Sequence, residues 1–183
     1  LLLAYILSIP LGILSAVTHR SWSDRIVSVK LFALYSFPAM FLGVLLRNYL
    51  ATDLKWFPVS KFESADHADM TVVEQTWDVA HHMALPLATL TLGSLAYFSR
   101  YMKAGLMEII RADFVRTARA KGLSEFVVVM RHAVRNSLIP IVTLLGASLP
   151  AIIGGAVIVE FIFEIPGMGF LGYEAAIRKD FSI

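Results

Sequence analysis

The sequence predicts an all-α fold built from several membrane-spanning helices, and three observations carry this prediction. The 183-residue chain is 57% hydrophobic and only 16% charged. Its mean hydropathy of +0.70 lies well outside the range of ordinary soluble domains. The charged residues are clustered, and they leave long uncharged windows at 1–17, 31–46, 83–99 and 136–159.

Each window, extended by a few flanking residues, is a predicted membrane span, near 1–17, 27–50, 80–100 and 136–160. An α-helix needs about 20 residues to cross about 30 Å of hydrocarbon, and only the last window reaches that length unaided. The first window is not a secretory signal, because its positive charge, Arg20, follows the apolar run. Pro38 and Pro86 predict bends in the second and third spans.

The basic residues orient these spans, since Lys and Arg in short loops mark the cytoplasmic side. Three basic residues fall within 18–30 and eight within 100–135, whereas residues 51–82 carry two lysines against six acidic residues. We therefore expect the loop 101–135 to be cytoplasmic and the loop 51–82 and the segment 161–183 to be external. The same distribution accounts for a pI near 9.0 without nucleic-acid binding, because the net charge is only +2.

Small residues recur at four-residue spacing in the last predicted span: Gly146, Ala147, Ala151, Gly154 and Gly155. Such residues allow close approach of a neighbouring helix. The pattern leaves two interpretations open, ordinary helix packing and the lining or gating of a path between helices.

The cytoplasmic loop predicts two helices joined by a tight turn. From Tyr101 to Lys121 apolar residues recur at helical spacing, which indicates an amphipathic extension of the third span. Gly122 can end this helix in the left-handed conformation, and Ser124 can cap a second helix over 125–136, before Pro140 opens the last span. This pair either docks a cytoplasmic partner, packs on its own spans or lies in the lipid interface.

At these residues the sequence resembles the permeases of binding-protein-dependent ABC importers. Their cytoplasmic motif runs Glu-Ala-Ala, three residues, Gly, nine residues and Ile-x-Leu-Pro. Here Arg116-Thr117-Ala118 and Gly122 align with the first part, and His132, Val134 and Arg135 with the second, so the Glu, the Ile and the Pro are absent. The runs Arg-Thr-Ala-Arg-Ala-Lys-Gly and His-Ala-Val-Arg-Asn are instead similar to the dipeptide, oligopeptide and nickel branch.

A second motif of that branch, Glu-x-x-Phe-x-x-Pro-Gly-x-Gly-x-Leu, follows the last predicted span. It is matched by Glu160, Phe163, Pro166, Gly167, Gly169 and Leu171. We interpret Pro166, Gly167 and Gly169 as an external turn. They form no phosphate-binding loop, because the Gly-x-x-x-x-Gly-Lys-Ser/Thr pattern is absent.

The resemblance implies a polytopic permease domain of the type I ABC importer kind, in the cytoplasmic membrane of a bacterium or archaeon, with a further span before and after these residues. It implies that the short helix around the motif glycine docks in a cleft on an ATP-binding subunit. The residues carried over as this coupling contact are Arg116, Thr117, Ala118, Gly122 and Leu123.

The implied partners are two ATP-binding subunits, a second homologous permease and an external solute-binding protein. ATP and Mg would bind the ATP-binding subunits, so we expect this chain to bind no cofactor and to be no enzyme. The implied cargo is a short peptide or nickel.

Two other classes of protein fit the residues less well. A secondary transporter or channel not driven by ATP usually needs ionisable residues in mid-membrane, and the four windows contain none. An intramembrane enzyme needs a nucleophile with its base or a His-Glu-x-x-His pair, and neither appears. His67, Asp69, His81 and His82 fit solvated positions near a membrane boundary better than a metal site.

Overall fold

The computed structural model describes residues 1–148 and 156–179. Every regular element in these residues is a helix, and the all-α prediction is confirmed. The chain divides into two compact units, residues 1–36 with 92–149 and residues 37–91 with 150–183.

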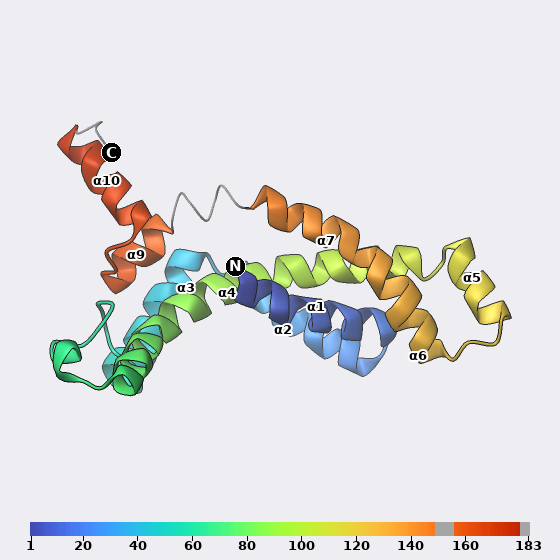
Figure 1. Ribbon diagram of the computed structural model, residues 1–183, viewed down its shortest axis with the longest axis horizontal. Helices are drawn as coiled ribbons and strands as arrows, with labels where there is room; N and C mark the ends of the chain where they lie inside the picture. Colours follow the sequence, from blue (N-terminus) through green and yellow to red (C-terminus); the bar gives the residue numbers. More distant parts are fainter. Residues whose placement is uncertain (149–155, 180–183) are drawn as a thin grey trace. The chain divides into compact units, whose positions relative to one another are not determined.

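The first unit packs two N-terminal helices against residues 92–148. Helices α1 (Leu2–Val17) and α2 (Trp22–Ser36) contact one another, and α5 (Asp113–Ala120) follows the end of α4 (Val72–Ile109) (Figure 1). After a turn at residues 121–124, the short α6 (Glu125–Val127), the π-helical η3 (Val128–Val134) and α7 (Arg135–Ala147) follow one another without a break.

The core of this unit lies around the C-terminal part of α4. Met102 and Leu106 are fully buried there, and Phe98 stacks on Tyr5 of α1 with the ring centroids 4.1 Å apart. A Cβ atom on Gly12 would lie 2.6 Å from the Met102 Cβ, so glycine is required for α1 to approach α4 this closely.

The second unit combines α3 (Ala39–Leu46), the π-helical η1 (Arg47–Asp53), the short 3-10 helix η2 (His67–Asp69) and the N-terminal part of α4 with α9 (Val157–Phe163) and α10 (Met168–Arg178). Its core consists of five buried apolar residues, Ala51, Leu85, Val159, Ile162 and Phe163.

Two described helices are long and apolar enough to cross a membrane, Val72–Ile109 and Glu125–Ala147. The pair Trp22–Ser36 and Ala39–Asp53 would be a third span if it is counted as one, and Leu2–Val17 is a shorter apolar helix. The bend predicted at Pro38 is a break in the helix, because Phe37 and Pro38 lie outside both α2 and α3. At Pro86, by contrast, α4 continues.

The loop 101–135 differs from its predicted helices at two points. The extension of the third span ends at Ile109, and residues 110–112 separate it from α5, whereas one helix was expected over 101–121. The second helix continues into the last span, so Pro140 lies inside α7 and does not open it.

Candidate functional site

The loop 101–135, which we call the coupling segment, presents α5 with one face buried and one face exposed. Val115 and Ala118 point into the core formed by Met102 and Leu106 of α4 and by four residues of η3, Val128, Val129, Ala133 and Val134. Arg116 and Thr117 lie on the exposed face. Burial of the apolar face therefore fixes α5 to α4 and to the start of the second helix.

The turn after α5 depends on glycine for its backbone conformation. Gly122 has a φ of +80°, in the left-handed region that side chains other than Asn and Asp avoid. Apart from its two chain neighbours, no heavy atom of the described residues lies within 4 Å of the position of a Cβ on Gly122, so there is open space around the turn. Ser124 occupies the predicted N-cap position of α6, but its side-chain oxygen accepts no capping hydrogen bond from the backbone.

An ion pair closes the turn from the other side. The Arg119 Nε–H donates to Glu125 Oε2 at 3.0 Å, and Nη2–H donates to Oε1 at 2.6 Å. A third donor, Nη1–H, points to the Ile110 carbonyl oxygen at 3.4 Å, at the end of α4. The hydrogen bonds to Glu125 raise the pKa of the Arg119 guanidinium above its usual value. This arginine links three consecutive helices, a role the sequence pattern did not reveal.

The five predicted contact residues do not share one environment. Arg116, Thr117, Gly122 and Leu123 are exposed, and Leu123 is 41% exposed despite its apolar side chain. Ala118 is only 5% exposed and faces the core. Its small side chain positions α5 and is not part of the outer surface.

A buried carboxylate joins the N-terminal helices to the part of α4 that lies within the coupling segment. Asp24 accepts from the Lys103 Nζ at 2.5 Å, and from the Ser15 hydroxyl and the backbone N–H of Arg20. The Asp24 side chain is 8% exposed, so the charge of Lys103 offsets much of its desolvation cost. Sequence reasoning missed this pair, since charges in two separate loops carry no signal of contact.

In the second unit, the second motif holds the starts of two helices together. The Glu160 carboxylate accepts from the Ala156 N–H at 3.0 Å, at the start of α9, and from the Phe170 N–H at 2.7 Å, in the first turn of α10. These N–H groups have no partner within their own helices. Phe163 is buried in the core of this unit.

The glycines of this motif are required by space. A Cβ on Gly167 would lie 2.6 Å from Glu160 Oε2, and a Cβ on Gly169 would lie 2.8 Å from the Val157 backbone nitrogen. Pro166, Gly167 and Gly169 therefore form a turn that brings α10 onto α9, and the external side of the membrane remains a prediction for it.

The predicted small-residue stripe is only partly described. Gly146 and Ala147 are exposed on α7, and no side chain of the described residues meets the position of a Cβ on Gly146. Ala151, Gly154 and Gly155 lie outside the described residues.

His67 and His82 of the loop 51–82 belong to a hydrogen-bond network around Asp78, whereas His81 lies 2.9 Å from the Trp56 carbonyl oxygen. The Ser64 N–H and hydroxyl donate to this carboxylate at 2.9 and 2.6 Å, and Nδ1 of His67 lies 2.9 Å from Oδ2. Among the described residues there is no group of three or more His, Cys, Asp or Glu that fits a metal ion. The network ties the loop to α4.

Comparison with known proteins matches residues 8–183 to the family described as "Binding-protein-dependent transport system inner membrane component". The chain belongs to this family. The permease is 34% identical over 182 residues to the oligopeptide transport system permease protein AppB of Bacillus subtilis (strain 168). It is 36% and 34% identical over 180 residues to the glutathione transport system permease proteins GsiC of Pectobacterium atrosepticum and Escherichia coli (strain K12).

These matches cover 100%, 98% and 98% of the permease but 56%, 54% and 54% of the relatives, so the chain spans about half of their length. The resemblance drawn from the two motifs is confirmed, because the chain belongs to this family of inner-membrane permeases and the matched relatives are named for oligopeptide and glutathione transport.

Proposed function

We propose that this chain forms part of the translocation path of an ATP-driven importer of short peptides and couples to an ATP-binding subunit through the tip of the coupling segment. We define the coupling tip as Arg116, Thr117, Gly122 and Leu123. The observation that carries the proposal is that the coupling tip is exposed while the opposite face of α5 is buried against α4. Val115 and Ala118 anchor α5 to α4, so a force applied at the tip reaches a predicted membrane span.

The composition of the tip fits a protein partner. Leu123 is 41% exposed, and Phe126, in the next helix, is 75% exposed. The basic side chains of Arg116 and Lys121 are exposed as well. Aromatic side chains and arginine are enriched in protein interfaces. The partners would be two ATP-binding subunits that carry ATP and Mg, a second permease and an external solute-binding protein.

Short peptides are the proposed cargo. Relatives of this permease are named for oligopeptide and glutathione transport. Nickel is less well supported, since the described residues include no cluster with metal-ligand composition.

Two variants at the tip test the docking without disturbing the base. Thr117→Trp adds bulk to the exposed face of α5, and Gly122→Asn adds a side chain that tolerates positive φ and meets open space. In the full-length protein, each is expected to insert normally but to reduce co-purification of the ATP-binding subunit by about tenfold or more, the effect of one lost interface anchor. Peptide uptake should fall in parallel.

Arg111→Trp is the matched control, because Arg111 is exposed just after α4 and lies outside the coupling tip. Normal co-purification in both tip variants would overturn the docking role. Uptake that persists when ATP is depleted but an ion gradient remains would instead favour a secondary transporter.

A further inference from the structure

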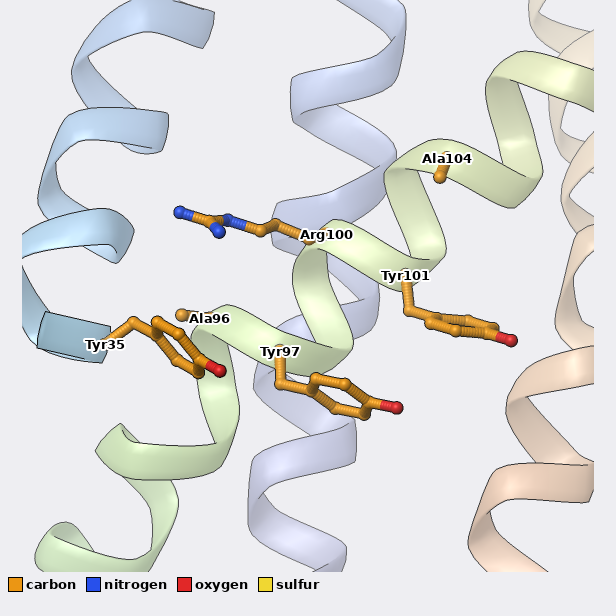
Figure 2. Close-up of a pocket in the computed structure, with 6 residues that line it drawn as sticks. All are labelled: Tyr35, Ala96, Tyr97, Arg100, Tyr101 and Ala104. Atoms are coloured by element: carbon orange, nitrogen blue, oxygen red, sulfur yellow. The ribbon is translucent and has the colours of Figure 1, made fainter. Parts of the chain in front are cut away.

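A groove on α4 in the first unit carries a basic group among tyrosines. It is lined by Tyr35 of α2 and by five residues of α4, Ala96, Tyr97, Arg100, Tyr101 and Ala104, and has a volume of about 290 Å³. In Figure 2, Arg100 extends from α4 toward α2, and Tyr97 and Tyr101 project to the other side. The small side chains of Ala96 and Ala104 form the floor of the groove.

Arg100 is held in place by aromatic rings. Its guanidinium lies 5.6 Å from the ring centroid of Phe32 and 5.7 Å from that of Tyr35. Among the described residues no carboxylate forms a salt bridge with it, whereas Lys103, three residues further on, is paired with Asp24. Arg100 therefore carries an oriented positive charge that is free for an anionic partner.

Its position along the helix indicates which anion. Arg100 stands where the third predicted span meets the coupling segment, and tyrosines and basic residues concentrate at such membrane interfaces. Basic pockets between helices on the cytoplasmic side bind lipid headgroups. Ala96, Tyr97 and Tyr35 continue the groove as an apolar surface.

We propose that this groove binds an anionic phospholipid of the cytoplasmic leaflet, with its phosphate at Arg100 and an acyl chain along Ala96, Tyr97 and Tyr35. The acidic Glu108 does not cancel the attraction, because it lies about 12 Å further along α4, beyond the screening length of about 8 Å at physiological salt. The inference rests on the inner-membrane family and on the predicted cytoplasmic side of Arg100. It does not depend on ATPase docking.

The test measures lipid retained by the full-length protein in nanodiscs of phosphatidylcholine with a minor share of phosphatidylglycerol. Native mass spectrometry of the wild type is expected to show a larger fraction of phosphatidylglycerol among the retained lipids than in the nanodisc as a whole. Arg100→Gln should lower that enrichment about fivefold, the effect of one basic residue at a membrane surface. Ala104→Leu, which keeps the charge but fills the floor of the groove, should lower it as well.

Arg25→Gln is the matched control, since the Arg25 guanidinium also lies over a ring, 5.6 Å from that of Trp22, but does not line the groove. It should retain at least half of the wild-type enrichment. An equal loss of phosphatidylglycerol enrichment in Arg25→Gln and Arg100→Gln would show that any surface basic residue has this effect, and it would overturn the proposal. So would a photo-crosslinker at Tyr97 that labels a second permease chain or a bound peptide instead of lipid.

Discussion

Glu160 illustrates how a single carboxylate can set the geometry of a motif. Two backbone N–H groups from the starts of α9 and α10 point at its two oxygens, and Gly167 packs so close that a Cβ would collide with the carboxylate. The spacing Glu-x-x-Phe-x-x-Pro-Gly-x-Gly thus brings three features into one turn: the hydrogen-bond acceptor Glu160, the buried Phe163, and glycines where a Cβ would not fit.

Glu160→Gln is expected to lower the free energy of unfolding of the full-length protein by about 1 to 3 kcal/mol. The amide offers one acceptor oxygen to two donors, and its NH₂ group would face the second N–H. Glu164→Gln is the control, because the one ion pair that Glu164 forms among the described residues is an exposed pair with Arg47 at 3.3 Å, which contributes about 0 to 1 kcal/mol. Thermal unfolding in detergent measures both, and equal losses would contradict the assigned role of Glu160.

The helix pair of the coupling segment depends on contacts as well as on periodicity. Amphipathic spacing over 101–121 predicts one continuous helix, but the helix is interrupted at residues 110–112. The next helix, α5, begins after Ala112, which is in an extended conformation. The break lets Val115 and Ala118 reach Met102 and Leu106. Helical periodicity is unchanged by one short interruption, and so the spacing of apolar residues could not locate it.

Arg119→Ala and Glu125→Ala are each expected to loosen α5 and its turn. Because the pair is partly exposed, at 38% and 62%, its contribution is at most about 1 kcal/mol. Amide hydrogen exchange in residues 113–125 should therefore rise up to about fivefold in either variant. The double variant should add little, since the two residues form one interaction.

Arg131→Ala serves as the comparison, because Arg131 is exposed on η3 and forms no ion pair among the described residues. Its exchange rates over 113–125 should match the wild type. Additive effects in the double variant would mean that Arg119 and Glu125 act independently.

At the scale of the whole molecule, the orientation in the membrane is directly testable because this chain contains no cysteine. Ala65→Cys, exposed in the external loop, should react with a membrane-impermeant maleimide in intact spheroplasts. Arg111→Cys, exposed within the coupling segment just after α4, should react only after permeabilisation. Any cysteine elsewhere in the full-length protein is first replaced by serine, and the reverse labelling pattern would invert the predicted topology.

Composition and motifs by themselves determined the helical class, the permease family, the sidedness expected for each loop and the positive φ at Gly122. These properties depend on hydrophobicity, on the distribution of charge and on local backbone sterics, all of which are local in the chain. The same local information recognised Ala118 as a motif residue, but not that it faces the core.

Tertiary structure alone decided the contacts between distant residues. The Asp24–Lys103 pair joins positions 79 residues apart, and Arg100 gains its setting from rings on another helix. Whether a charge is paired or free depends on which helices pack together. That choice is made by the summed burial of many apolar side chains, which the spacing of a single motif does not record.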